Sequence, residues 1–449
     1  MLATVGLVSS CGRPASPSTS SPASASPTDV FEQQRTDGVN SLLDKLDKAL
    51  LHGRPADLDA LLDRSASKTF RQQLHVAQDN LSSAGAAPSP APRAGDPAPV
   101  RYRIYQHFIG SADAEELVPD AVANRLAAEG SSDNWVSPVR LRFALGGTGA
   151  PGLDEPEIEI DTPLVVARYD DEWKLVGDLA LLGRPATGAG LWSFPGARAQ
   201  TAQTAGGQSV VASYPQSRDL AARITALLPD SVRAVSAFWG ANWPQRALVV
   251  TAGTDQQFAA LAASPDSDTA DAAAATVYTA LDVPNHTVTG QRIVFTPAAR
   301  LLPPAMLAVV LRHELSHVAV RLATGVDTPL WLAEGLAEYV GRKGSYSRFD
   351  DVAPDLAAAT RTGTPPSWPT DEDFTVDSQR AALAYQSAWS IAAFVAQSRS
   401  EDALRKMYLG VAGAADPEAA KIALASAVGV PQGELERQWR AWVRKQSGG

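Results

Sequence analysis

Two histidines four residues apart, with a glutamate between them, constrain this chain more than any other feature of its sequence. They lie in the segment Leu311–Val340, which reads LRHELSHVAVRLATGVDTPLWLAEGLAEYV. Because residues four apart on an α-helix share one face, about 6 Å from each other, His313 and His317 can bind one metal ion together. Glu314 would lie beside that ion and could accept a proton. The pattern is typical of zinc hydrolases.

The surroundings of this motif favour a metal site over chance. An H-E-x-x-H pentapeptide alone is a weak signal, because polar residues on one helix face are usually just solvated. Here, however, the ionisable residues interrupt an apolar helix, with AMLAVVL before them and VAVRLA after them. Buried ionisable groups are costly unless they are paired or bound to metal.

Residues that start and stop helices divide the segment into two helices. The first is expected over Pro304–Thr324. The second is expected to be capped by Asp327 or Thr328, to carry Pro329 in its first turn and to end before Gly341.

Packed antiparallel, these helices would bring a glutamate back beside the histidines. At 1.5 Å per residue, the first helix falls about 10 Å from His317 to its end, and the second rises about 8 Å to Glu334. Glu334 would then lie level with His317, and Glu338 level with His313. We therefore assign Glu334 as the third metal ligand. Glu338 is expected to orient the ring of His313 through its other nitrogen.

HELSH followed by PLWLAEGLAEY resembles the gluzincin metallopeptidases, in particular the peptidase MA-like domains related to thermolysin and the zinc aminopeptidases. The resemblance implies one Zn²⁺ bound by His313, His317 and Glu334, with Glu314 as the general base. Sixteen residues separate His317 from Glu334, slightly fewer than in the aminopeptidases, which implies a tighter turn between the helices. The G-x-M-E-N segment, which recognises a free substrate amine in that group, is absent upstream.

The reaction implied by this resemblance is hydrolysis of a peptide bond by a zinc-bound water, with a peptide or protein as the substrate. The family also has a helical C-terminal lobe that closes one side of the cleft. Tyr385, in ALAYQSAWSIAAFVAQ, matches the phenol that stabilises the developing oxyanion there, or it is an ordinary packed tyrosine. Two alternatives stay open: a cell-surface binding protein with a structural or catalytically silent zincin domain, and hydrolysis of a non-peptide amide.

A strand expected over Gln291–Phe295 precedes the first metal-site helix. In the resembling family the equivalent strand lies at a sheet edge and pairs with the extended substrate backbone, which holds a peptide without reading its side chains. An internal sheet strand is the alternative. His286, in the preceding turn, is interpreted as a loop residue.

The start of the chain resembles a bacterial lipoprotein signal. The only cysteine, Cys11, ends the sequence VSSC after a short apolar run, and a Ser/Pro/Ala-rich tract follows. The resemblance implies an extracytoplasmic protein anchored to the cell membrane by lipid on Cys11. No Lys or Arg precedes the apolar run, as a signal usually requires, so an ordinary N-terminal thiol is the alternative.

Helical periodicity followed by alternating strands predicts an α+β domain after this tether. Strands are expected in VRYRIYQHFI, VRLRFAL and TPLVVARYDDEWKLVGD, the last folding as a hairpin with its turn at Asp170 and Asp171. This order, with the ending RYDDEWKLVGD, resembles the nuclear-transport-factor-2-like cone fold. His107, which alternates with tyrosines on the first strand, is interpreted as a packed or surface histidine and not as a ligand.

The chain as a whole is expected to be α+β: a cone domain of helices and antiparallel sheet, then a thermolysin-like zincin domain with a helical C-terminal lobe. A hairpin over 198–213, helices over 216–228 and 232–238, and strands over 247–251 and 276–281 are expected between them. A length of 449 residues predicts two or three domains, and a net charge of −10 argues against a nucleic-acid partner. The predicted parts are a signal and tether (1–28), the cone domain (29–183), a connection (184–207) and the gluzincin domain (208–449).

Overall fold

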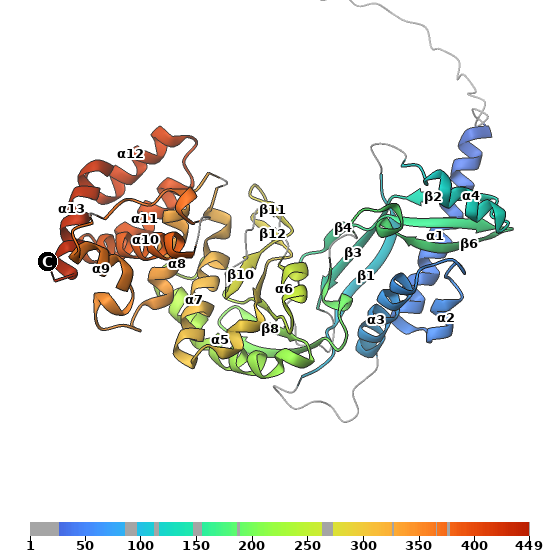
Figure 1. The fold of residues 1–449 in the computed structure, drawn as a ribbon, viewed down its shortest axis with the longest axis horizontal. Coiled ribbons are helices and arrows are strands. Elements are labelled where there is room, and N and C mark those ends of the chain that lie inside the picture. The colour runs from blue at the N-terminus through green and yellow to red at the C-terminus, as the bar shows by residue number, and fades with distance from the viewer. Residues whose placement is uncertain are drawn as a thin grey trace, which may run out of the picture.

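The computed structural model has an elongated shape in which three groups of elements follow one another along the long axis (Figure 1). The residues that the structure describes are 27–85, 97–111, 116–146, 155–185, 189–262, 273–325, 327–364, 366–374 and 378–448. Mixed helices and strands come first, a five-stranded sheet lies in the middle, and helices form the C-terminal end. The expected α+β class is confirmed. Residues 1–26 of the predicted signal and tether, with Cys11, lie outside the described residues, and its last two residues begin α1.

The N-terminal region combines four helices with two small antiparallel sheets. Its elements are α1 (Pro27–His52), α2 (Pro55–Asp59), α3 (Lys68–Gly85), β1 (Tyr102–Ile109), α4 (Asp120–Ala128), β2 (Asp133–Ser137), β3 (Val139–Leu145), β4 (Ile158–Asp161), β5 (Leu164–Tyr169) and β6 (Glu172–Asp178). The strand orders are β1-β3-β4 and β2-β5-β6. Leucines at helical spacing on α1, such as Leu42, Leu46 and Leu50, are buried against these strands. The β5–β6 hairpin is confirmed, with Asp170 at a φ of 53° in its turn.

The central sheet is buried on both faces. Its elements, with the short ones around it, are η1 (Leu179–Leu182), η2 (Leu191–Ser193), β7 (Arg198–Thr204), β8 (Gly207–Ser213), η3 (Pro215–Ser217), α5 (Arg218–Trp239), β9 (Leu248–Thr251), α6 (Asp255–Leu261), β10 (Ala274–Val277), β11 (Ala280–Asp282), β12 (Thr287–Thr289), β13 (Arg292–Phe295) and η4 (Pro297–Leu301). The order is β10-β13-β9-β8-β7, with β9 parallel to β8 and β13 and the outer pairs antiparallel. Val249 faces the core shared with α5, whereas Val250 packs toward α6 and the N-terminal region.

Two expectations for this region were wrong. The segment expected to form two helices is the single helix α5, which continues through Pro229. Proline removes one backbone donor, but the neighbouring residues Leu228 and Val232 are fully buried in the core and hold the helix together. The strand expected over 276–281 is divided between β10 and the β11–β12 hairpin.

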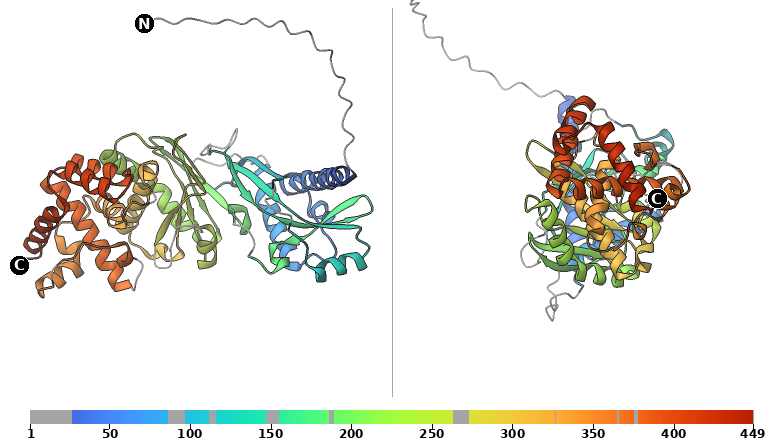
Figure 2. Two further views of the ribbon diagram at one scale, coloured as in Figure 1. Left: turned by 90° about the horizontal axis from the view of Figure 1, so that it is seen from above. Right: turned by 90° about the vertical axis from the view of Figure 1, so that its left-hand side faces the viewer.

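The C-terminal region is helical. Its elements are α7 (Pro304–Val320), η5 (Arg321–Ala323), α8 (Leu330–Arg342), η6 (Phe349–Asp351), α9 (Pro354–Arg361), η7 (Asp371–Phe374), α10 (Ser378–Ser398), α11 (Glu401–Ala412), α12 (Pro417–Val428) and α13 (Gln432–Gln446). Figure 2 shows these helices gathered at the end of the molecule away from α1. In the described part of the chain, no helix is both long and apolar enough to cross a membrane.

Helix α8 lies between α7 and α10, and two glycines permit this close approach. A Cβ on Gly335 would be 2.5 Å from the carbonyl oxygen of Ala388 on α10. A Cβ on Gly341 would be 3.0 Å from the carbonyl oxygen of Val309 and 3.3 Å from the Cβ of His313, both on α7. Gly341 therefore lies inside α8, not past its end as expected, because the helix packing requires a residue without a side chain there.

The predicted cap of α8 was also wrong. Pro329 occupies the N-cap position, and neither of the two polar residues before it caps the helix with its side chain. The backbone N–H of Leu330 instead donates to the carboxylate of Asp371 at 2.8 Å. This acceptor comes from η7, 41 residues later, so local sequence could not reveal it.

The predicted division of the chain into four parts stays a prediction. Strand β7, which falls in the expected connection 184–207, pairs along its length with β8 in the central sheet. Contacts also cross from the N-terminal region: the side chain of Asn80 donates to the carbonyls of Trp192 and Phe194 and accepts from the N–H of Ala197.

Candidate metal centre

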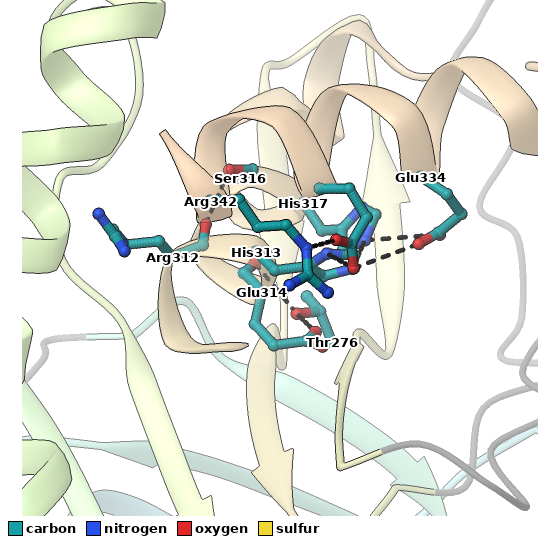
Figure 3. A network of polar contacts seen from close by, with 9 residues as sticks. Thr276, Arg312, His313, Glu314, Ser316, His317, Glu334 and Arg342 are labelled. Carbon is teal, nitrogen blue, oxygen red and sulfur yellow. Dashed lines mark hydrogen bonds and ion pairs between the residues drawn. The ribbon is translucent and has the colours of Figure 1, made fainter. Parts of the chain in front are cut away.

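Helices α7 and α8 bring two imidazoles and one carboxylate together. His313 Nε2 lies 3.2 Å from His317 Nε2 and 3.2 Å from Glu334 Oε2. His317 Nε2 lies 3.5 Å from Glu334 Oε1. Figure 3 shows the three side chains pointing toward one another from the two helices. Among the described residues, they form the one group of at least three His, Cys, Asp or Glu side chains whose ligand atoms all lie within 4.8 Å of one another.

These separations fit a small tetrahedral ion. Ligands bound to zinc at about 2.0–2.1 Å in tetrahedral geometry are about 3.3 Å from one another. The observed values of 3.2, 3.2 and 3.5 Å agree with that distance without rearrangement of either helix. Two histidines and one glutamate are also a donor set that suits zinc and leaves one coordination position for another group.

Glu338 and Arg342 continue the arrangement behind His313. Glu338 Oε1 lies 3.4 Å from His313 Nδ1, the ring nitrogen that faces away from Glu334. Arg342, one turn along α8, forms an ion pair with Glu338. The carboxylate of Glu338 can therefore accept the Nδ1 proton of His313, which leaves Nε2 as the ligand atom.

Burial and charge act in opposite directions on these groups. Burial alone would raise the pKa of Glu334, but His317 and His313 outweigh it and hold that pKa well below its usual range. Burial alone would lower the pKa of His313, but Glu334 and Glu338 hold it well above its usual range. A proton on His313 and a divalent cation are thus alternative ways to balance the two carboxylates, since neutral imidazole is the ligand form.

Glu314 is buried on the side of α7 that faces the central sheet. The hydroxyl of Thr276, on β10, donates to Glu314 Oε2 at 2.7 Å. Only 6% of Glu314 is exposed. The hydrogen bond from Thr276 fixes the direction of its carboxylate. Glu314 is therefore held beside the two histidines by a residue from the sheet (Figure 3).

The edge strand next to α7 is β10, and of the two alternatives for Gln291–Phe295 the internal strand is the one observed. Strand β13 (Arg292–Phe295) lies inside the sheet, between β10 and β9. Strand β10 (Ala274–Val277) pairs with β13 on one side only and packs against α7. Strand order is a tertiary property, so the sequence could predict the strands but not which of them is the outer one.

Tyr385 on α10 faces the same group of carboxylates. The charge of Glu334, with burial and the charges of Glu338 and Glu314, raises the pKa of Tyr385 well above its usual value. The phenol is therefore protonated and can donate a hydrogen bond. Its ring also packs edge-on against Phe374, with 5.1 Å between the ring centroids.

The remaining candidate histidines lie elsewhere. His107 packs in the N-terminal region, where its Nδ1 is 2.5 Å from Asp47 Oδ1 on α1. His286 lies in the turn between β11 and β12, as expected, with a φ of 52°. Neither belongs to the metal group.

Sequence reasoning missed Thr276 and Arg342. Arg342 could have been found, because it follows Glu338 by four residues on the same helix. Thr276 carries no local signal, because it precedes Glu314 by 38 residues on another element. No known protein family and no curated protein matches the chain.

Proposed function

We propose that the protein is a zinc-dependent metallopeptidase of the gluzincin type that hydrolyses peptide bonds. The observation that carries this proposal is the convergence of His313, His317 and Glu334 at tetrahedral ligand separations, with Glu314 held alongside. The resemblance of HELSH and PLWLAEGLAEY to peptidase MA-like domains supports the same conclusion.

His313, His317 and Glu334 would hold the ion. When bound, Zn²⁺ supplies a Lewis acid and lowers the pKa of a coordinated water to about 7. Glu314 accepts a proton from the attacking water and delivers it to the leaving amine. Thr276 orients the Glu314 carboxylate for both proton transfers, since its hydroxyl donates a hydrogen bond to one of the two carboxylate oxygens.

Tyr385 and β10 complete the proposed site. The protonated phenol of Tyr385 donates a hydrogen bond to the oxygen on which negative charge develops. The outer edge of β10 offers backbone groups to an extended peptide, and its Thr276 lies directly beside Glu314. This arrangement brings a peptide backbone past the metal ligands without selecting particular side chains.

The test is chelator-sensitive cleavage of a mixed fluorogenic peptide library by the purified protein. We expect cleavage that 1,10-phenanthroline abolishes and Zn²⁺ restores. The Glu314→Gln variant should keep its metal and lose cleavage, whereas Glu334→Ala should lose both. The rival function is a cell-surface binding protein with a silent zincin domain, and it predicts bound metal without cleavage. Full activity in Glu314→Gln would overturn the mechanism.

We also propose that the protein is anchored outside the cytoplasm through lipid on Cys11. The lipobox-like sequence before Cys11 supports this, and the Ser/Pro/Ala-rich tract after it would serve as the tether. Labelled lipid should attach to the wild type in bacterial cells and not to Cys11→Ser. Equal labelling of both proteins would exclude the anchor.

A further inference from the structure

Arg321 lies one helical turn beyond His317. It is the first residue of η5, continues α7 with right-handed helical backbone angles, and is four residues after the metal-ligand histidine. Residues at this spacing share a helix face about 6 Å apart. The guanidinium group is therefore placed at the end of α7 where the candidate metal centre lies.

Two neighbours confirm this position. The guanidinium carbon of Arg321 lies 4.7 Å from the ring centroid of Tyr278, which follows the edge strand β10 by one residue. Burial raises the pKa of Tyr408, the hydrogen bond with Thr324 and the charge of Arg321 lower it, and the charge of Glu334 raises it, so this phenol lies within electrostatic range of both charged groups. Arg321 thus packs beside the residue that follows β10, one helical turn from His317.

The charge of Arg321 is not neutralised by a carboxylate. Among the residues that the structure describes, Arg321 has no ion pair within 4.0 Å, and its Nε is buried without a hydrogen-bond partner. Arg342 on α8, by contrast, is paired with Glu338. The cation–π contact with Tyr278 uses the face of the guanidinium group and leaves the N–H donors at its edge available.

We propose that Arg321 binds a carboxylate of the substrate, so that the enzyme prefers peptides with an acidic side chain or a free C-terminal carboxylate near the scissile bond. An unpaired, half-buried guanidinium is a poor structural element, because buried donors without acceptors cost free energy. It is a good recognition element, because its planar fork matches a carboxylate with two parallel hydrogen bonds. Tyr278 holds the fork beside β10, where a peptide backbone would pass.

This inference rests on the proposed peptidase function, and the experiment separates the two. Four fluorogenic peptide pools would be compared: Glu-containing, Gln-containing and Lys-containing pools with C-terminal amides, and the Gln-containing pool with a free carboxylate. We expect the wild type to cleave either the Glu pool or the free-acid pool about 10–100-fold faster than the Gln amide pool, the range for a hydrogen bond to a charged group. The Glu pool identifies a side chain as the source of the carboxylate, and the free-acid pool identifies the chain end.

Arg321→Gln should remove this preference while the rate on the Gln amide pool stays within about threefold. Arg321→Lys should keep part of it, because the charge remains and the fork is lost. Lys421→Gln is the matched control, since it removes one exposed positive charge on α12 and should change nothing. Zinc content and thermal denaturation of each variant would show that the fold and the metal site are intact.

Binding provides a second measurement that does not need turnover. The same pools would be titrated against Glu314→Gln and against the double variant Glu314→Gln/Arg321→Gln, with fluorescence anisotropy as the signal. Carboxylate-dependent binding that Arg321→Gln abolishes supports the proposal, even if no pool is cleaved and the peptidase function fails. Equal cleavage of all amide and acid pools, or a preference that survives Arg321→Gln, overturns it and leaves the peptidase function standing.

Discussion

Among the described residues, buried histidines contact carboxylates in two places, one in each half of the molecule, and only one of these places has the composition of a metal site. In the N-terminal region His107 and Asp47 are 2.5 Å apart, with side chains 9% and 13% exposed. In the C-terminal region His313 and Glu334 are 3.2 Å apart, with side chains 13% and 16% exposed. Burial and pairing are therefore almost the same in the two places.

The difference lies in what else reaches the carboxylate. Asp47 accepts from the backbone N–H of His107 as well as from its ring, so both oxygens bind one residue and tie β1 to α1. Glu334 faces imidazoles from two different turns of α7. A buried histidine with a carboxylate is thus a structural tie by default, and a second imidazole at ligand distance is what makes a metal site.

The largest expected effect comes from removing one histidine in each of the two places. His317→Ala should lose most of its zinc on dialysis and reduce hydrolysis to background, because two ligands do not hold the ion. His107→Ala should keep full zinc content and lose about 1–3 kcal/mol of stability, because the buried Asp47 keeps the backbone N–H of residue 107 but loses the imidazole. Elemental analysis and thermal denaturation measure the two quantities. Zinc loss in His107→Ala would show that the comparison is wrong.

The next effect separates metal binding from chemistry within the C-terminal site. Glu314→Gln should keep its zinc and lower kcat about 10²–10⁴-fold, the usual contribution of a general base. Thr276→Val removes the hydroxyl that holds Glu314 and keeps the shape of the side chain, so kcat should fall less and zinc content should not change. Steady-state kinetics with elemental analysis test both variants, and zinc loss in either would mean that these residues support the ligands.

Glu155 is another buried carboxylate, and its charged neighbours are arginines instead of imidazoles, so pH should reveal the difference. Burial raises the pKa of Glu155 to about 7 from 4.5, although Arg292 and Arg246 lower it. Between these two pH values, the folded state therefore keeps a proton that the unfolded chain has already released. Stability from this group is complete below about pH 4.5 and is lost as pH rises through about 7, by about 3 kcal/mol at 1.36 kcal/mol per unit.

Glu155→Gln should remove that dependence. The variant should melt with the wild type at pH 4.5 and above it at pH 8, since glutamine keeps the shape and cannot ionise. Thermal denaturation of both proteins across this range gives the difference curve, in which the other titrating groups cancel. A constant difference at every pH would mean that Glu155 is ionised in the folded protein.

Helical arithmetic made much of the candidate site predictable. The rise of 1.5 Å per residue and the spacing of four residues placed Glu334 level with His317 and Glu338 level with His313, and the structure brings these groups within 3.5 Å of each other. Such predictions succeed because each helix is specified locally and only one turn separates the two. The α+β class followed in the same way from the order of periodic segments.

What the sequence left open or predicted wrongly depended on contacts between elements distant in the chain. The edge position of β10 and its Thr276 follow from the strand order of the sheet, which no local pattern encodes. Gly341 looked like a helix stop but is a contact point between α7 and α8. Pro229 indicated a helix boundary, but α5 continues past it because the residues around it are buried in the core. In each case tertiary packing outweighed a local preference.

The smallest expected effect tests whether the carboxylate behind His313 acts like Asp47 or like a part of the metal site. Glu338 is paired with both His313 and Arg342, as a structural carboxylate would be, yet it faces the nitrogen opposite the ligand atom. Glu338→Ala should weaken zinc affinity or hydrolysis about 10–100-fold, because the ring of His313 loses its orienting acceptor. Asp47→Asn, which alters the matching carboxylate of the N-terminal pair, should leave zinc affinity unchanged. Competition with a zinc-binding dye measures the zinc affinity of both variants. If Glu338→Ala binds zinc as tightly as Asp47→Asn and hydrolyses at the same rate, Glu338 is a structural carboxylate. The metal site would then consist of its three ligands and Glu314 alone.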